Sequence, residues 1–433
     1  MKEVKINVHQ VTRIEGHANI VVNAKNGKID EIQWQIPESP RLFEAMLVGR
    51  HYQDVPYIAS RICGICSIAH TTCSIQAVEH AFGVKLTDQT RLLRRLLYNA
   101  EVLESHVLHT LFLAAPDLLG VDSVFPLVET HKDVVVMAVN FKRLAYNLAE
   151  AIAGRKTHPI TCVVGGFAKA PDPEHLKDLR ERLKAAIDDM NTIVLLFKSL
   201  LPRIPDFTRE TEYIALKDTE EYAWVRGLIA SSDSDPEPLE KYLDMTNEYC
   251  VPQSTAKWAK NNRDSYMVGA LARFNLNSSQ LSPLAKSAAS ELGINAPVHN
   301  PFWINVAQVV ETAHAVEDSI RIIDKLLTRG IKPEEPRVQP KAGRGVGAVE
   351  APRGILFHDY TFNDDGICTK ANCIIPTNQN HANIQKDMEK LVPELMGNNS
   401  SEDDIRQNLE VLVRAYDPCV SCSTHLINLN FKK

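Results

Sequence analysis

The sequence has no long apolar segment and no strong excess of either charge. Its most apolar run, TIVLLFKSLL at 192–201, contains Lys198 and falls short of the ~18 residues that a membrane-crossing helix needs. The formal net charge is −6 over 433 residues, with acidic and basic residues intermixed. A nucleic-acid binder usually carries a basic stripe. The sequence therefore predicts neither a membrane span nor a nucleic-acid partner.

The N-terminus also lacks the features of a secretory signal. MKEVKINV leads directly into an alternating strand pattern, without the apolar core of a signal peptide. The nine cysteines are odd in number, and C-x-x-C pairs in an intracellular protein indicate metal or redox sites rather than a disulfide framework. We therefore expect a cytoplasmic protein.

The hydrophobic periodicity predicts a mainly helical chain with β-structure near both ends. Residues 4–36 alternate as strands do, and Asn26-Gly27 is a hairpin-turn signal. Apolar residues at helical spacing predict helices over 41–52, 67–83, 88–115, 134–154, 174–201, 301–328, 382–396 and 402–415. Asp172, just before Pro173, is the expected N-cap of the helix over 174–201.

Two regions break the helical pattern. Residues 202–265 are polar and turn-rich, which favours an irregular excursion with some β-structure, and residues 337–376 predict glycine-rich turns and short strands. No linker divides the chain. The sequence predicts one domain over 1–433 of α+β class, with a core of long helices and β-structure near both termini.

Two cysteine pairs lie near opposite ends of the chain, Cys63 with Cys66 and Cys419 with Cys422. Four thiolates on two such turns can form one pocket for a soft metal. An ordinary zinc ribbon separates its pairs by about 15–20 residues, whereas most of the protein separates these. The site would join the two ends of a large fold.

On spacing alone, structural zinc is the default for four cysteines. A thioredoxin-like redox pair is the other simple reading of one C-x-x-C, but no βαβ pattern surrounds either pair. Zinc would make the chain a structural or interaction protein rather than an enzyme.

The residues flanking the pairs favour a different metal. The first pair lies in RICGICSIAH at 61–70 and the second in DPCVSCSTH at 417–425. Together they resemble the large, catalytic subunit of nickel–iron hydrogenases. Further matching segments are RIEGH at 13–17, SPRLFE at 39–44, APRG at 351–354 and IPT at 375–377. The segment YMVGALAR at 266–273 resembles one typical of the cytoplasmic, cofactor-coupled branch. One departure is VGG at 164–166, where the family usually has Pro-Gly-Gly.

The resemblance implies a ligand set. Cys63 and Cys419 would bind nickel terminally, and Cys66 and Cys422 would bridge it to an iron that carries carbon monoxide and cyanide. Soft thiolate donors suit both metals. Cys419 would also take the proton released when H2 is split, since the thiolate is the reactive form of cysteine.

The resemblance also implies roles for charged residues. Glu15 would relay the proton from the cysteine sulfur; taken alone, it would be a surface carboxylate on a strand. Arg353 would lie over the metals as a permanent cation; taken alone, it would be an exposed loop arginine. Asp117 and Asp417 would be the acidic partners of Arg353, although Asp117 could instead end a helix.

A second, redox-inert ion, magnesium, is implied near the C-terminus. Glu44, the backbone carbonyl of Cys373 and a ring nitrogen of His425 would contact it, and hard oxygen donors suit magnesium. Pro376 and Thr377 would surround a cyanide. His70 would hydrogen-bond a cysteine sulfur; without the resemblance it would be an ordinary helix residue.

Too few patterned cysteines remain for an iron–sulfur cluster, which normally takes four. Electrons would therefore leave through an iron–sulfur small subunit, with further electron-transfer subunits beyond it. The expected activity is reversible cleavage of H2 into protons and electrons. The quinone-site subunit of respiratory complex I resembles this family, but it has lost the cysteine pairs that this chain keeps. Residues 426–433 follow His425 directly and could be a processed tail or a retained short strand.

Overall fold

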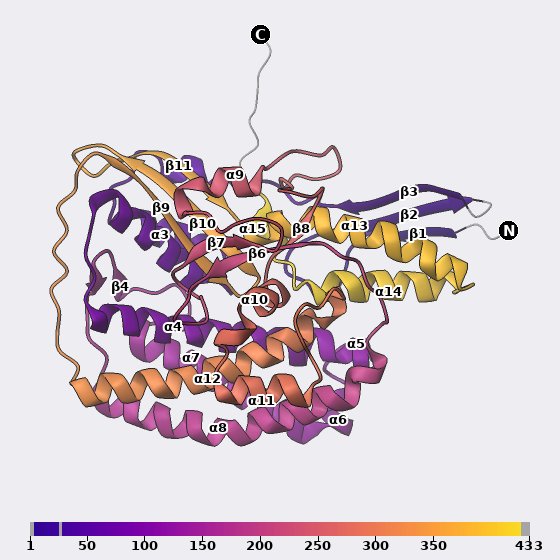
Figure 1. Ribbon diagram of the computed structural model, residues 1–433, viewed down its shortest axis with the longest axis horizontal. Coiled ribbons are helices and arrows are strands. Elements are labelled where there is room, and N and C mark those ends of the chain that lie inside the picture. Colours follow the sequence, from indigo (N-terminus) through magenta and orange to yellow (C-terminus); the bar gives the residue numbers. More distant parts are fainter. Residues whose placement is uncertain (1–3, 26–27, 426–433) are drawn as a thin grey trace, which may run out of the picture.

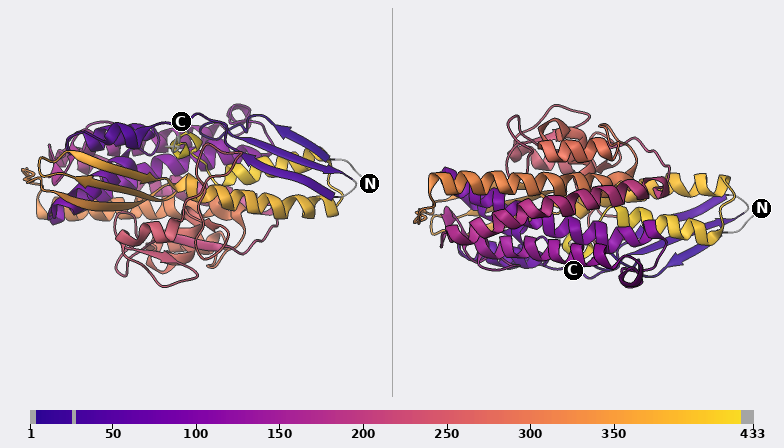
Figure 2. Two further views of the ribbon diagram at one scale, coloured as in Figure 1. Left: turned by 90° about the horizontal axis from the view of Figure 1, so that it is seen from above. Right: turned by 90° about the horizontal axis from the view of Figure 1, so that it is seen from below.

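Four long helices form one layer of the molecule. The computed structural model describes residues 4–25 and 28–425. α4 (Asp88–Val107) packs against α7 (Lys132–Ala153) and α12 (Ile304–Arg329), and α12 also packs against α8 (Pro173–Leu200). Figures 1 and 2 show these helices side by side across the width of the molecule. The predominantly helical α+β class expected from the sequence is confirmed.

The ends of the long helices follow from local chemistry. The side chain of Asp172 accepts a hydrogen bond from the amide of Glu174, so this residue caps α8 as the sequence predicted. Thr87 caps α4 in the same way. Ser401 and Asp404 form a reciprocal capping box at the start of α14 (Glu402–Ala415).

The helix predicted over 88–115 is interrupted near its end. A π-helical segment, Leu108–Ala114, separates α4 from the short helix α5 (Ala115–Leu119). The amide of Ala115 bonds the carbonyl of Thr110, five residues back. Pro116 has no amide hydrogen to continue an ordinary ladder, which gives a physical reason for the irregularity. Such π segments are frequent at functional sites.

An antiparallel sheet of three strands lies at the N-terminal end: β1 (Val4–Val8), β2 (Asn19–Lys25) and β3 (Lys28–Gln35). Alternate residues of β1 are buried. The sheet packs on α13 (Pro376–Gly397) and α14 near the other end of the sequence, as Figure 1 shows. Elements distant in sequence are therefore neighbours here.

A second three-stranded sheet is covered by α3 (Ser67–Phe82). Its strands are β9 (Gly343–Ala351), β10 (Gly354–Phe362) and β11 (Cys368–Ile374). The strands predicted over 337–376 are present, but they are longer than expected, because β9 and β10 each have nine residues. The glycines belong to the strand itself. A Cβ on Gly345 or Gly347 would lie 2.1 or 2.2 Å from a carbonyl of α3, so glycine lets the helix approach.

The excursion over 202–265 contains part of a third sheet, formed by β6 (Glu212–Lys217), β7 (Leu228–Ser231) and β8 (Tyr266–Met267). Of the helix predicted over 41–52, only the short helix α1 (Phe43–Leu47) is formed, and α2 (Val55–Ala59) follows beyond that range. The remaining α-helices and strands of the described residues are α6 (Leu127–Thr130), β4 (Cys162–Val163), β5 (Gly166–Phe167), α9 (Tyr242–Thr246), α10 (Ala270–Asn277), α11 (Pro283–Glu291) and α15 (Val420–Ser423). Among the described residues, no helix combines the length and apolarity of a membrane span.

Candidate metal centre

The fold brings the two cysteine pairs together. The sulfurs of Cys63, Cys66, Cys419 and Cys422 all lie within 4.8 Å of one another, and all four residues are buried. Cys63 and Cys419 are 356 residues apart in sequence, yet their sulfurs are 3.6 Å apart. All four are free thiols. Thiol groups gathered at this spacing, without disulfides, form a donor set that fits a metal.

The first pair is part of the helical scaffold. Cys66 is the N-cap residue of α3, and its amide donates to the sulfur of Cys63 at 3.2 Å. Glu101 of α4 accepts hydrogen bonds from the amides of Ile68 and Ala69 in the first turn of α3, at 2.6 and 3.0 Å. These bonds satisfy amides that a helix start leaves unpaired. Sequence reasoning missed Glu101, because a single glutamate among the apolar residues of α4 carries no signal of this role.

The second pair depends on side chains from elsewhere. It follows Asp417, whose φ is 51°; Cys419 is the N-cap residue of the four-residue helix α15, and Cys422 lies within that helix. The amide of Cys419 donates to Oγ1 of Thr377 at 3.1 Å. The amide of Val420 donates to the carbonyl of Glu15 at 2.9 Å. Thr377 begins α13 next to Pro376, so the predicted Pro-Thr turn lies beside this cysteine.

The electrostatics of the cluster favour a cation. Hydrogen bonds from Cys419, and then from Cys422 and Cys66, hold the pKa of Cys63 well below its ordinary value. The neighbouring sulfurs of Cys422, Cys63 and Cys66 raise the pKa of Cys419 well above its ordinary value. One thiolate therefore makes further thiolates unfavourable. Deprotonating all four requires a positive ion among them.

Glu15 contacts the second pair directly. The sequence suggested that it lies on a β-strand, but it belongs to none of the sheets that the described residues form. It sits between β1 and β2 and forms a single parallel bridge with Cys419. The thiol of Cys419 donates to its Oε2 at 3.2 Å, and the amide of Ser421 donates to the same oxygen at 3.0 Å. The hydroxyl of Ser421 bonds Oε1. A half-buried carboxylate thus touches a cysteine sulfur.

Arg353 lies in the two-residue turn between β9 and β10 and is 5% exposed, so it is not an exposed loop arginine. Its Nε donates to the carbonyl of Asp417 at 2.6 Å, and it forms an ion pair with Oδ1 of Asp417 at 2.8 Å. Burial opposes the charge, but Asp417 and the sulfurs of Cys419, Cys66 and Cys63 raise the pKa of Arg353 well above its ordinary value. The guanidinium stays protonated.

Asp117 is not a partner of Arg353, and that prediction was wrong. It lies in α5 after the π segment and pairs with Arg13 and with Arg414 of α14, whose Nε is 2.7 Å away. The irregular end of α4 turns this carboxylate towards the loop before Glu15. Asp117 therefore anchors Arg13, two residues before Glu15, rather than Arg353.

Glu44, His425 and Cys373 surround a second polar site. Oε2 of Glu44 lies 3.2 Å from Nδ1 of His425. Neither atom makes a well-formed hydrogen bond within the described part of the chain, and Nε2 of His425 makes none either. Burial opposes ionisation of Glu44, but the contact with His425 lowers its pKa. The Glu44 charge in turn adds to burial in raising the pKa of the Cys373 thiol. Buried polar atoms without partners fit an ion there.

His70 lies on α3 within the buried face behind the cluster. Its Nδ1 is 3.1 Å from Nε2 of His358 on β10. Among the described residues, the His70 ring forms its hydrogen bond with His358. The predicted bond from His70 to a cysteine sulfur is therefore not formed here. Burial lowers the pKa of His70 to about 3 although the nearby Cys63 thiolate raises it. The ring is therefore neutral.

Arg41 is a second residue that sequence reasoning missed. Its guanidinium donates to the carbonyl of Ile62 at 2.7 Å and to that of Ser421 at 3.0 Å. These carbonyls precede Cys63 and lie between Cys419 and Cys422. One planar fork thus ties the two cysteine segments together. The signal that could have found it is the segment SPRLFE, in which Arg41 precedes Glu44 by three residues.

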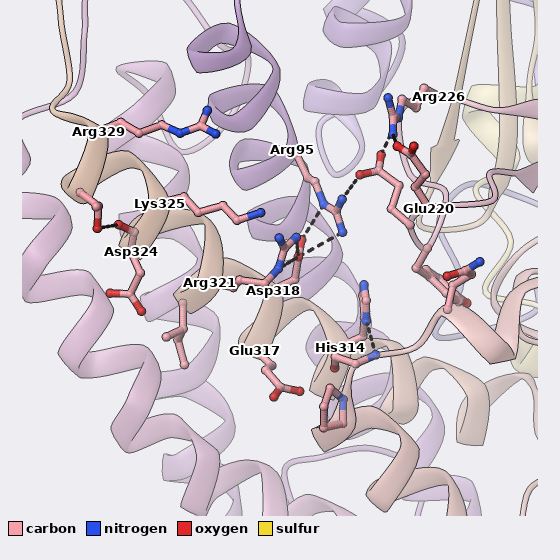
Figure 3. Close-up of a pocket in the computed structure, with 17 residues that line it drawn as sticks. Arg95, Glu220, Arg226, His314, Glu317, Asp318, Arg321, Asp324, Lys325 and Arg329 are labelled. Carbon is pink, nitrogen blue, oxygen red and sulfur yellow. Dashed lines mark hydrogen bonds and ion pairs between the residues drawn. The ribbon is translucent and has the colours of Figure 1, made fainter.

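A cavity of about 860 Å³ lies between α4, α12 and the loop at 220–226, and no cysteine lines it. Figure 3 shows Arg95 pointing at Asp318, with Arg321 on the same carboxylate. The charges that line this cavity largely neutralise one another, so nothing in it competes with the cysteine cluster as the candidate site.

Comparison with known proteins identifies relatives over the whole chain. The family described as nickel-dependent hydrogenase matches residues 41–132 and 240–425, and a family described as HoxL-like matches residues 5–39. The chain is 32% identical to the alpha subunit of sulfhydrogenase 2 of Pyrococcus furiosus, over 98% of this chain and 100% of that one. It is 30% identical to the alpha subunit of sulfhydrogenase 1 of the same organism, over 98% of each chain. A crystal structure of NAD+-reducing NiFe hydrogenase in the H2-reduced state superimposes with a TM-score of 0.88 and 26% identity, covering 97% of this chain and 99% of that chain.

Proposed function

The chain belongs to the nickel-dependent hydrogenases, and we propose that its four clustered cysteines hold the nickel–iron centre at which it works. It is the catalytic subunit of a hydrogenase, an oxidoreductase that splits H2 reversibly and passes the electrons to an iron–sulfur subunit. The observation that carries the assignment of the centre is the convergence of four buried thiol sulfurs within 4.8 Å.

The proposed ligand roles follow the two pairs. Cys63 and Cys419 would hold nickel, and Cys66 and Cys422 would hold both nickel and an iron that also carries carbon monoxide and cyanide. When bound, this centre supplies the Lewis acidity and electron-accepting capacity that cleave H2. Thr377 accepts a hydrogen bond from the amide of Cys419 and follows Pro376, and these two residues would surround a cyanide of the iron. His70 braces α3 behind the first pair through His358.

A proton route begins at Cys419. Its sulfur accepts the proton that H2 releases, and Oε2 of Glu15, 3.2 Å away, takes it from there. The amide and hydroxyl of Ser421 hold both oxygens of Glu15, so the carboxylate is oriented before transfer. A carboxylate within hydrogen-bond reach meets the geometric requirement for general acid–base work.

Arg353 supplies a fixed positive charge beside the sulfurs. Because it remains protonated, it acts by charge and hydrogen bonding rather than by taking the proton from H2. Asp417 binds it through both a backbone carbonyl and a carboxylate oxygen, at 2.6 and 2.8 Å. The ion pair thereby links the β9–β10 turn to the residues that precede Cys419.

We assign the second polar site to magnesium. The buried Glu44 carboxylate and Nε2 of His425, which has no hydrogen-bond partner among the described residues, support a cation there, and the carbonyl of Cys373 is the expected third contact. The ion would join Glu44 to His425, three residues after Cys422, and so hold the C-terminal segment beside the second cysteine pair. It would not change oxidation state, so its role is to hold His425 in place.

Electron transfer requires partners. Within the described residues, Cys63, Cys66, Cys419 and Cys422 are the cysteines clustered closely enough to hold a metal, and an iron–sulfur cluster would need four more. We propose that an iron–sulfur small subunit docks on this chain and passes electrons to further subunits. The NAD+-reducing structure that this fold resembles supports a cytoplasmic electron acceptor. Co-purification with mass spectrometry identifies these subunits, and cell fractionation tests the compartment.

Elemental analysis and infrared spectroscopy of the purified complex test the centre. We expect one nickel and one iron per chain, together with absorption bands of metal-bound carbon monoxide and cyanide. Removal of magnesium by chelation should lower thermal stability without changing these bands. An active preparation that contains zinc and shows no bands would overturn the assignment of the cysteines.

We also propose that residues 426–433 are removed when nickel is loaded. They lie outside the described residues, so the proposal rests on the sequence: the tail follows His425 immediately, and its removal would free the carboxylate end beside the second polar site. Intact-mass measurement of the nickel-loaded protein decides the matter. A fully active chain that retains Lys433 contradicts processing, and it leaves the hydrogenase assignment unchanged.

A further inference from the structure

Arg273 is a completely buried arginine whose donors are all used. It lies on α10 and is 0% exposed. Its Nε and one terminal nitrogen bond the two carboxylate oxygens of Glu311 at 2.6 and 2.7 Å, and the other terminal nitrogen bonds Glu350 at 3.0 Å. The two remaining N–H groups donate to the carbonyls of Ala351 and Pro352, each at 2.9 Å. An arginine has five N–H donors, so none is left over.

The two carbonyls are those of the residues immediately before Arg353. Ala351 is the last residue of β9, and Pro352 and Arg353 form the turn to β10. The start of α10 also presses on this turn, because a Cβ on Gly269 would lie 3.0 Å from the carbonyl oxygen of Arg353. Arg273 thus fixes the peptide groups of Ala351 and Pro352, which set the direction of the Arg353 side chain.

Arg273 is itself held rigidly from the helical layer. Glu311 of α12 accepts from the hydroxyl of Tyr222 at 2.7 Å, and Nε2 of His106 lies 2.7 Å from its second oxygen. Burial opposes ionisation of Glu311, but Arg273 lowers its pKa to about 2. Ser105, next to His106 on α4, contacts Arg353 directly at 3.4 Å. The same helices therefore support both arginines.

We propose that Arg273 is a positioning residue for the hydrogenase reaction, acting by fixing the β9–β10 turn so that Arg353 stays aimed at Asp417 and the cysteine cluster. The proposal rests on the proposed function of that cluster. Lysine offers three donors on one point charge and cannot reproduce the planar five-bond pattern. Catalytic groups must be held to within a fraction of an ångström, and a shift of about 1 Å can reduce a rate about 100-fold.

A double-mutant cycle separates this role from simple stabilisation. The variants are Arg273→Lys, Arg353→Lys and the double variant, each assayed as the complete complex for H2 oxidation with a redox dye. If Arg273 acts through Arg353, its substitution lowers kcat at least about 10-fold in the wild-type background. It lowers kcat less than about 3-fold when Arg353 is already lysine, because contacting residues are not additive. Equal losses in both backgrounds overturn the proposal.

Arg94→Lys is the matched control. Arg94 is also buried and forms a bidentate pair with Glu79, at 2.6 and 2.7 Å, but none of its bonds to described residues involves the turn. We expect Arg94→Lys to combine additively with Arg353→Lys. Amide hydrogen exchange gives a readout independent of turnover. Exchange over residues 350–356 should accelerate in Arg273→Lys and remain unchanged in Arg94→Lys. Unchanged exchange in both variants contradicts the proposal.

Metal content and the infrared bands are measured on every variant. If the wild-type complex lacks the bands, the proposed function fails, whereas intact bands with additive kinetics reject only the role of Arg273. If Arg273→Lys does not fold, Glu311→Gln takes its place in the cycle, because it keeps the shape of the partner while removing its charge. A non-additive loss in that cycle supports the proposal, and an additive loss rejects it.

Discussion

The two cysteine pairs share the C-x-x-C spacing but are built in different ways. The first pair leads into the sixteen-residue helix α3, whose opening turn is bonded by Glu101 of the neighbouring helix α4. The second pair belongs to the four-residue helix α15, with Cys419 at its N-cap and Cys422 within it. Its backbone is held by side chains or carbonyls of Glu15, Arg41 and Thr377, which belong to three distant segments.

The centre therefore has two halves that differ in how they are supported. We call Cys63 and Cys66 with α3 the fixed half, and residues 416–425 with Cys419 and Cys422 the closing half. Helix α3 packs along β9 and β10 over its length, so its position follows from the hydrophobic core. The second pair has little regular structure of its own, and its contacts with Glu15 and Arg41 join residues hundreds of positions apart. We therefore expect disturbance of the centre to appear first at residues 416–425. Four predictions test this expectation, from the largest effect to the smallest.

Replacing either pair should abolish metal binding and activity. In Cys63→Ser/Cys66→Ser and in Cys419→Ser/Cys422→Ser, two of the four sulfurs are lost, so we expect nickel content and H2 oxidation at background level. In both variants, amide exchange should accelerate over residues 416–425 while α3 stays protected. Cys250→Ser, at an exposed cysteine, is the control. Equal loosening of α3 would break the distinction between the two halves.

Glu15→Gln should block proton transfer and leave the centre intact. Glutamine keeps the acceptor oxygen for Ser421 but cannot carry the proton, so H2–solvent deuterium exchange should fall about 10²–10⁴-fold. Nickel content and infrared bands should not change. Glu129→Gln alters an exposed carboxylate on α6 and serves as the control. Wild-type exchange in Glu15→Gln would show that the closing half carries no proton route.

Arg41→Lys should loosen the closing half. A single ammonium cannot bond the carbonyls of both Ile62 and Ser421 with the geometry of the guanidinium. Charged hydrogen bonds contribute about 1.5–3 kcal/mol, so we expect a loss of that order in the free energy of unfolding and faster nickel release to a chelator. Arg61→Lys changes an exposed arginine beside the first pair. If it releases nickel equally fast, Arg41 does not tie the pairs together.

Mild acid should weaken the closing half through His381. Its Nδ1 accepts from Trp34, its Nε2 bonds Ser423, and burial lowers its pKa to about 3. The unfolded chain takes up a proton below pH ~6.5 and the folded chain does not, so stability present above pH 6.5 is lost as the pH falls towards 3. Between pH 7 and 5.5 this costs about 1 kcal/mol.

Urea unfolding of the wild type and of His381→Gln at pH 7 and 5.5 measures that difference. The variant should show a smaller loss between the two pH values. The other buried histidines contribute equally to both proteins and therefore cancel. A pH dependence that is identical in the two proteins would mean that His381 does not titrate on unfolding.

Local features were predictable from the sequence, and side-chain partners were not. The helix expected over 402–415 has those bounds, and the one expected over 67–83 ends one residue earlier, because capping and apolar spacing are encoded nearby. The clustering of the cysteines was expected from their flanks. The pairing of Asp117 with Arg414, the loop around Glu15 and the roles of Arg41 and Arg273 depend on which distant segments meet. No periodicity encodes those meetings.

The separation of the two pairs also sets the timing of assembly. Cys63 and Cys419 are 356 residues apart, and chains grow at about 5–20 residues per second. Roughly 20–70 s of synthesis therefore pass between the first ligand and the last. During that interval the chain holds Cys63 and Cys66 but not Cys419 and Cys422, so the four-sulfur pocket cannot form. An organism that makes this protein needs a means of delivering nickel after synthesis, and the late arrival of Cys419 gives that delivery its opportunity.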